Sequence, residues 1–118
     1  ITLDVGGRLI RALRTTLDRS PRLAKLVERF AVNMQCDGTI FVDADIEVFS
    51  HVLSFLRRPD TFPLFWSKAT GFDYGLYARV KEEARYFGVK GLVDWIEERG
   101  YEKAVKQNVK YEKPVEIK

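Results

Sequence analysis

Alternating apolar and polar residues predict short β-strands in the first part of the chain. Residues 1–5 alternate strictly, which is the period of a half-buried strand. Gly6 and Gly7 then supply the backbone freedom of a tight turn, and a second strand is expected over residues 9–13. A third, short apolar strand is expected over residues 39–43. The pattern therefore predicts a hairpin and one further strand.

Helical spacing of apolar residues follows each of two capping signals in the first half. Ser20 precedes Pro21, and serine before proline is typical of a helix start. That helix is expected to end near Phe30. Asp45 precedes a second apolar stripe from Ile46 to Arg57. Since aspartate is a good N-cap, we predict that Asp45 caps this helix.

Two more helices are expected in the second half of the chain. One follows the apolar stripe from Leu76 to Phe87 and ends at Gly88, and the other covers Leu92 to Arg99. Strand patterns come early and helical patterns later, which predicts an α+β fold. Residues 1–100 are expected to form one domain. Residues 101–118 are expected to be a C-terminal extension, either a strand, an arm or a linker to a further domain.

A long aromatic segment separates the second and third predicted helices. Residues 59–72 contain two prolines and a glycine, so they are expected to form a loop, but Phe62, Phe65 and Trp66 give this loop much apolar surface. Two interpretations remain open. The aromatic side chains either pack on the neighbouring helices or form a surface for a partner protein.

Composition limits the classes of function. The 118 residues, 46% of them hydrophobic, suffice for one core. Twenty basic and 17 acidic residues give a mixed surface rather than a uniformly basic one. The charges are unevenly distributed, because residues 1–30 carry a net charge of +4 and residues 31–60 a net charge of −3. Such polarity suits contact with a neighbouring protein.

Catalytic and metal chemistry find little support in the sequence. One cysteine, Cys36, and one histidine, His51, cannot supply a structural zinc site. Nothing around Cys36 provides a base for nucleophilic catalysis, and His51 is expected on the solvent face of its helix. Asp43 and Asp45 flank a strand-to-helix junction, where capping explains them better than acid–base work. We therefore expect no enzyme activity, no cofactor and no metal.

The same features bear on location. A single cysteine cannot form an internal disulfide, which is typical of a reducing compartment. No apolar run approaches the ~20 residues that span a bilayer. A cytoplasmic or nuclear protein without membrane contact is expected.

Several motifs occur in an order that resembles the BTB/POZ domain of the potassium-channel tetramerisation (KCTD-like) type. The resemblance covers Ile1 to about Arg99 and implies a three-stranded sheet flanked by about four to five α-helices. The run Phe62-Pro63-Leu64-Phe65 is also similar to the fungal branch of BTB proteins. The motifs are Val5-Gly6-Gly7, Phe41-Val42-Asp43-Ala44-Asp45, Phe49, Phe55-Leu56-Arg57 and Glu83-Ala84-Arg85-Tyr86-Phe87-Gly88-Val89 with Leu92 and Ile96.

This resemblance implies a non-catalytic protein interaction and self-assembly module. Members of the family form rings, commonly of four or five protomers, and many are substrate adaptors for cullin-type ubiquitin ligases. A ring joins two different faces of the protomer, so the oppositely charged segments supply candidate contacts. The self-association candidates are the basic residues Arg8, Arg11 and Arg14 and the acidic residues Asp37, Asp43 and Glu47. The partner-binding candidates are Phe62, Phe65 and Trp66.

An alternative function belongs to another class. The basic N-terminal third and the tail, which has five lysines and three glutamates after Gly100, would suit a nucleic-acid-binding module. Strongly salt-dependent binding to DNA or RNA would favour this alternative. A discrete oligomer without such binding would favour the interaction module.

Overall fold

The three N-terminal strands form one small sheet. The computed structural model describes residues 1–29, 32 and 34–106. β1 (Thr2–Val5) pairs antiparallel with β2 (Arg8–Arg11) and parallel with β3 (Ile40–Val42), so the strand order is β2-β1-β3. The hairpin turns at Gly6 and Gly7, whose φ angles of 57° and 97° favour glycine. The predicted hairpin is confirmed.

Two helices follow the hairpin. α1 (Arg14–Leu17) is a single turn that the sequence pattern did not predict. α2 (Pro21–Glu28) begins where expected, and the Ser20 hydroxyl accepts a hydrogen bond from the backbone N–H of Leu23 at 3.2 Å. The predicted end of this helix, near Phe30, lies outside the described residues.

α4 (Ile46–Arg57) has the predicted bounds and carries six buried apolar side chains. Asp45 is extended, with φ −75° and ψ 119°, and its carboxylate accepts a hydrogen bond from the N–H of Glu47 at 3.0 Å. This is the geometry of an N-cap, which satisfies a backbone donor that the first helical turn leaves unpaired.

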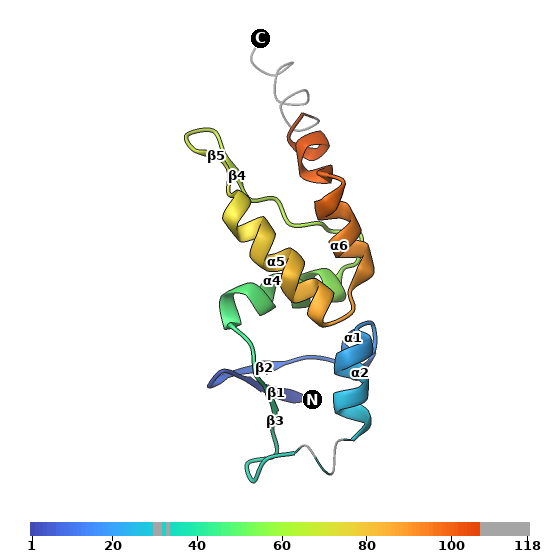
Figure 1. Cartoon of the computed structure of the whole chain (residues 1–118). Coiled ribbons are helices and arrows are strands. Elements are labelled where there is room, and N and C mark those ends of the chain that lie inside the picture. The colour runs from blue at the N-terminus through green and yellow to red at the C-terminus, as the bar shows by residue number, and fades with distance from the viewer. Residues whose placement is uncertain (30–31, 33, 107–118) are drawn as a thin grey trace, which may run out of the picture.

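α5 (Tyr74–Tyr86) and α6 (Lys90–Glu97) complete the helical layer. Asp73 caps α5 by accepting a hydrogen bond from the N–H of Leu76 at 3.0 Å. Figure 1 shows α4, α5 and α6 gathered on one side of the sheet, with α1 and α2 beside the sheet at the lower end of the view. The short connection between α5 and α6 turns at Gly88, whose φ is 75°.

The C-terminal extension begins as a helix. Residues 100–106 are helical, so no strand starts at Tyr101. Tyr101 is buried and its ring stacks on Tyr77, with centroids 4.1 Å apart. Within the extension of residues 101–118, for which a strand, an arm or a linker was expected, residues 101–106 are therefore helical and pack on the domain. Residues 107–118 lie outside the described part of the chain.

The predicted aromatic loop contains a small second hairpin. β4 (Trp66–Ser67) pairs antiparallel with β5 (Gly71–Phe72). Together the two sheets and the helices confirm the α+β class. The core joins the sheet to the helices, because Leu3 and Val5 of β1 are fully buried in one cluster with Phe49 of α4. Phe87, predicted to lie in the core, is 2% exposed and meets Phe49 edge to face, with ring centroids 5.2 Å apart.

Candidate interaction surfaces

The basic self-association candidates lie on and beside an edge strand. Arg8 and Arg11 are on β2, and Arg14 begins α1. All three side chains are exposed. The Arg11 carbonyl oxygen accepts a hydrogen bond from the Arg57 guanidinium at 2.7 Å, so its backbone is anchored to the end of α4 while its side chain remains in solvent.

The acidic candidates lie around the opposite edge strand. Asp43 directly follows β3, and Glu47 lies in the first turn of α4. Asp37 has a structural role in the turn before β3. Its carboxylate accepts hydrogen bonds from the Thr39 hydroxyl at 2.6 Å and the Thr39 N–H at 3.1 Å, and these bonds lower the pKa of Asp37. Asp43 and Glu47 are therefore the better candidates for an intermolecular contact.

The sheet order separates the two groups. Because β1 lies between β2 and β3, the arginines of β2 and the Asp43 carboxylate lie at opposite edges of the sheet. A head-to-tail contact requires two different surfaces on one protomer. The geometry meets this requirement for Arg8 and Arg11 against Asp43.

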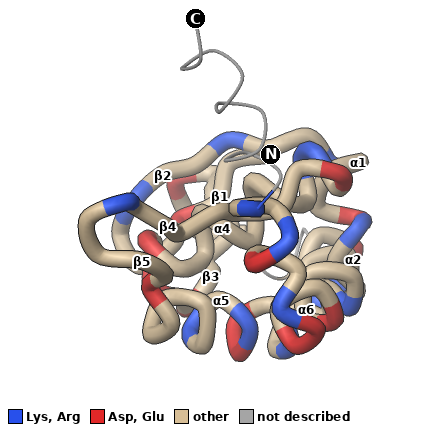
Figure 2. Tube along the Cα trace, turned by 90° about the horizontal axis from the view of Figure 1, so that it is seen from above, with Lys and Arg blue, Asp and Glu red and all other residues tan. Residues whose placement is uncertain are grey.

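The basic N-terminal third is not one surface. Figure 2 shows basic positions along α2 as well as near β2. Arg22, Lys25 and Arg29 come from α2 and its C-cap, and they line a hollow of about 560 Å³ that also includes Asp43. Their spacing of three and four residues places them on one helix face, and this spacing is visible in the sequence.

The aromatic candidates differ in how they pack. Phe65 lies 4.7 Å from both His51 and Tyr77, measured between ring centroids, and its N–H donates to the Tyr77 hydroxyl at 2.9 Å. Phe62 stacks on Trp95 with centroids 4.7 Å apart and ring planes inclined by 14°. The loop is thus held against α4, α5 and α6, as one of the two interpretations expected.

Part of the aromatic segment still faces solvent. Phe62, Leu64 and Trp66 are 36%, 37% and 37% exposed. Phe62 and Leu64 border a hollow of about 520 Å³ together with Arg57 and Arg58 from the end of α4. Exposed apolar side chains beside cations are a suitable surface for a protein partner, so the second interpretation stays a prediction for these residues.

His51 differs from its expected position in solvent. Its ring is half-buried beneath the Phe65 ring, and burial lowers its pKa, although the nearby Glu47 carboxylate opposes that effect. The helical pattern placed His51 opposite the apolar stripe correctly. The expectation of a solvent-facing side chain was wrong because the aromatic loop folds back over that face of α4.

This burial predicts a pH-dependent stability. The folded pKa of His51 lies below the unfolded value of about 6.5, so the unfolded chain binds more protons as the pH falls. The associated stability is complete above the unfolded pKa and is lost as the pH falls toward the folded pKa. The urea midpoint of the wild type is expected to fall between about pH 7.5 and about pH 5.5. In His51→Gln this decrease should be smaller, because glutamine does not titrate.

Glu83 contributes a pH dependence of the opposite sign, and it is present in both the wild type and the variant. Burial raises the pKa of Glu83, so its protonation favours the folded state as the pH falls, and His51→Gln leaves this effect in place. The chain has one histidine, so the imidazole pKa can also be followed directly by NMR. An unchanged pH dependence in His51→Gln would show that burial of this ring does not couple to folding.

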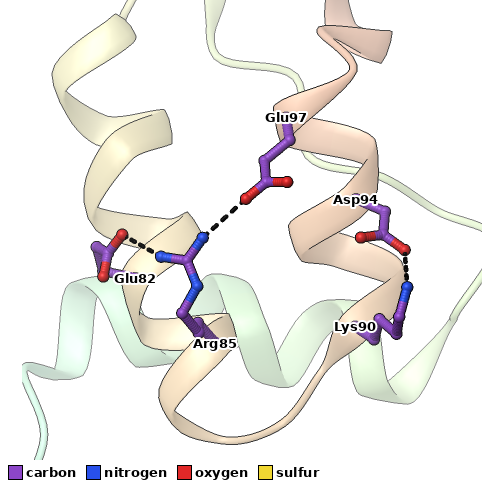
Figure 3. A network of polar contacts seen from close by, with 5 residues as sticks. All are labelled: Glu82, Arg85, Lys90, Asp94 and Glu97. Carbon is purple, nitrogen blue, oxygen red and sulfur yellow. Dashed lines mark hydrogen bonds and ion pairs between the residues drawn. The ribbon is translucent and has the colours of Figure 1, made fainter.

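Charged side chains on α5 and α6 pair with each other. Arg85 contacts Glu82 at 2.5 Å and Glu97 at 2.7 Å, and Lys90 contacts Asp94 at 2.7 Å (Figure 3). The Arg85–Glu97 pair joins the two helices. Exposed ion pairs contribute only about 0 to 1 kcal/mol each, so we assign these residues to the helix–helix surface rather than to a binding site.

Clustered metal ligands and membrane-spanning helices are both absent from the described part of the chain. Across residues 1–29, 32 and 34–106, no three His, Cys, Asp or Glu side chains lie close enough together to hold a metal ion. Cys36 is exposed. Among the same residues, no helix combines the length and the apolar character needed to cross a bilayer.

Comparisons with known proteins agree with the architecture. A protein-family model described as BTB/POZ domain matches residues 1–96. The chain is 34% identical over 97 residues to a potassium channel regulatory protein of Mus musculus and 33% identical over 97 residues to one of Homo sapiens. These matches cover 80% of the chain but only 34% and 33% of the two relatives, so the chain spans about a third of their length.

Proposed function

Because the chain belongs to the BTB/POZ family, of the potassium-channel tetramerisation type, we propose that it assembles head to tail into closed rings of four or five copies. Family and relatives support a protein–protein interaction or oligomerisation module. We propose in addition that the assembly is a ring, that it has four or five copies, and that the residues named below form its contacts.

The opposite charges at the two edges of the sheet carry this proposal. Arg8 and Arg11 lie at one edge, and Asp43 and Glu47 lie beside the other. When the basic edge of one protomer meets the acidic edge of its neighbour, one edge of each kind stays free at the two ends of the assembly. Further copies can therefore add until the rotation between neighbours brings the two ends together and closes a ring. Complementary charges favour this register and disfavour two like edges.

A charge reversal on β2 tests the contact. Arg11→Glu is expected to shift the protein toward monomer in size-exclusion chromatography with light scattering, because like charges would then face each other. The domain itself should remain folded, since the hydrogen bond from Arg57 reaches the Arg11 backbone rather than its side chain. Circular dichroism melting of the same sample checks this.

The control applies the same change elsewhere. Lys68 lies in the turn between β4 and β5 and is exposed, so Lys68→Glu should keep the wild-type mass. Reversing Asp43 or Glu47 in the Arg11→Glu background should partly restore assembly and would identify the opposing residue. Wild-type mass for Arg11→Glu would exclude Arg11 from the contact.

A second part of the proposal concerns the partner. We assign partner binding to the exposed aromatic surface of Phe62, Leu64 and Trp66, and its occupant to the scaffold of a cullin-type ubiquitin ligase, for which the chain would act as a substrate adaptor. The support is an apolar surface held rigidly by the Phe62–Trp95 stack. Rigid aromatic anchors lose little conformational entropy on binding.

Titration with a purified cullin N-terminal domain tests this assignment. Leu64→Glu is expected to weaken binding by at least about tenfold, because it places a charge in the apolar contact. Val32→Glu is a matched control, since Val32 is also exposed but lies between α2 and β3, away from the aromatic surface and from β2. No binding by the wild-type domain would exclude the adaptor role and leave the ring proposal untouched.

A further inference from the structure

We propose that the hollow between α2 and the end of β3 binds an acidic segment of another protein, an extended peptide in which carboxylates flank an apolar side chain. This hollow is the larger of the two described above, at about 560 Å³. It lies apart from the β2 edge and from the aromatic surface, and it shares only Asp43 with the proposed ring contact, so it is additional to the proposed function.

Three cations on one helix face give the hollow its charge. Arg22, Lys25 and Arg29 are all exposed, and within the described residues none of them forms an ion pair with an acidic side chain. Carboxylates that enter the hollow would therefore meet positive charge that the protein does not itself neutralise. Such a cluster raises the rate at which an acidic partner associates.

One of the three cations is held in place. The Arg22 guanidinium lies 4.0 Å from the centroid of the Tyr86 ring, and its Nε donates to the Tyr86 carbonyl oxygen at 2.7 Å. Stacking and this hydrogen bond fix the direction of the side chain before any ligand arrives. An oriented cation loses less entropy on binding a carboxylate than a freely rotating one.

The floor and rim of the hollow are apolar. Leu23 and Phe87 line it and belong to the core, while Phe41 and Tyr86 line it with 46% and 53% of their surface exposed. Phe41 is a large hydrophobic residue exposed on an edge strand, where it has no role in the core. An apolar side chain of a partner would cover Phe41 and Tyr86 together.

Among the described residues, one acidic residue lines the hollow, and it distinguishes a polypeptide from a nucleic acid. Asp43 lies in the same lining as the three cations. A nucleic acid carries a negative charge on every nucleotide, so one phosphate would lie near this carboxylate. A peptide can place an uncharged or basic residue there and its acidic residues beside α2.

A second copy of the chain is a poor occupant by the same reasoning. In the proposed ring, the neighbour approaches the β3 edge with Arg8 and Arg11, and these side chains would repel the cations of α2. Asp43 belongs both to the proposed ring contact and to the lining of the hollow, so the peptide and the neighbouring copy are expected to compete for the β3 edge.

Fluorescence anisotropy with a defined probe tests the proposal. The probe is a fluorescein-labelled octapeptide, Glu-Glu-Asp-Leu-Phe-Asp-Glu-Glu, titrated with the full chain. Binding is expected for the wild type and should weaken at least about tenfold in the Lys25→Glu/Arg29→Glu variant. The control, Lys68→Glu/Lys103→Glu, changes the net charge equally and should bind within about threefold of wild type.

Further probes separate the chemistry of the ligand. A peptide with serine in place of leucine and phenylalanine should bind at least about tenfold more weakly, and so should a single-stranded RNA octamer. Phe41→Ser should weaken binding of the first peptide, although it leaves the charge of the protein unchanged. Equal binding of the serine peptide or the RNA would overturn the proposal, because the hollow would then be a non-selective anion site.

Two variants separate peptide binding from ring assembly. Lys25→Glu/Arg29→Glu should keep the wild-type mass in light scattering, and Arg11→Glu should still bind the peptide after losing assembly. A monomeric Lys25→Glu/Arg29→Glu variant would show that the hollow is a contact between copies. That result, or no binding of the peptide at millimolar protein, would overturn the proposal.

Discussion

Phe87→Ala is expected to reduce the free energy of unfolding by about 3 to 5 kcal/mol, the usual cost of removing a buried phenylalanine ring. The side chain is 2% exposed and packs edge to face on Phe49 at 5.2 Å. Alanine would leave a cavity at the place where α4, α5 and α2 meet. Since domains are stable by only about 5 to 15 kcal/mol, the variant is expected to be partly or wholly unfolded at 37 °C.

Urea unfolding followed by tryptophan fluorescence measures this effect. Tyr86→Ala is the matched control, because Tyr86 is the adjacent aromatic residue but is 53% exposed. Its loss removes the stacking with Arg22, which is worth about 0.5 to 1 kcal/mol at an exposed site. Equal and small effects for the two variants would contradict the placement of Phe87 in the core.

Ser20→Ala is expected to cost about 2 to 4 kcal/mol, more than the loss of an ordinary helix cap. The Ser20 hydroxyl accepts the N–H of Leu23 and donates to the carbonyl oxygen of Phe87 at 2.6 Å. Ser20 is 0% exposed and Phe87 2%, so alanine would leave a buried carbonyl without its donor. An unsatisfied buried polar group adds about 1 to 3 kcal/mol to the loss of the cap.

A surface serine provides the comparison for that variant. Ser54 is exposed on α4, and Ser54→Ala is expected to change the stability by no more than about 0.5 kcal/mol. Denaturant midpoints at one pH compare the two directly. If Ser20→Ala matched Ser54→Ala, the hydrogen bond to the Phe87 carbonyl would not contribute to folding.

Phe87→Ala and Ser20→Ala both test the contact between the start of α2 and the segment that follows α5. The loop after α5 packs on the start of α2, where a Cβ added to Gly88 would lie 3.0 Å from the Pro21 ring. Gly88 also has φ 75°, so glycine is required there for two reasons. The contact between Ser20, Pro21 and the segment Phe87–Gly88 thus couples the sheet-bearing half to the helical layer.

Local signals were sufficient for much of this fold. The Gly6-Gly7 turn between alternating residues predicted the β1–β2 hairpin, and Asp45 before a long apolar stripe predicted the bounds of α4. These features depend on residues near each other in the chain. The family motifs added the sheet and the helical cluster as a whole.

Features that depend on distant contacts were not predictable. The β4–β5 hairpin and the half-buried His51 both follow from the aromatic loop packing on the helices, which no local period encodes. Residues 101–118 were expected to form a strand, an arm or a linker, yet Tyr101 is buried against Tyr77 in a helix. Tertiary packing outweighs local preference at these positions.

The interaction surfaces were predictable in part. Net charge by segment identified Arg8 and Arg11 as basic and Asp43 as acidic, but their placement at opposite edges required the strand order β2-β1-β3. The net charge of residues 1–30 combines the cations of α2 with those of β2, although the cations of α2 line a hollow that includes no residue of β2. Spacing along the helix, rather than the total charge, was the informative quantity.

The mass of the wild-type protein in solution tests the central claim most directly. Size-exclusion chromatography with light scattering at micromolar concentration and low salt should give four or five times the chain mass of 13.7 kDa. The assembly should weaken as salt rises, because exposed charges are screened over about 8 Å at physiological ionic strength. A single species of 13.7 kDa at low salt would contradict the ring and reduce the domain to a one-to-one binding module.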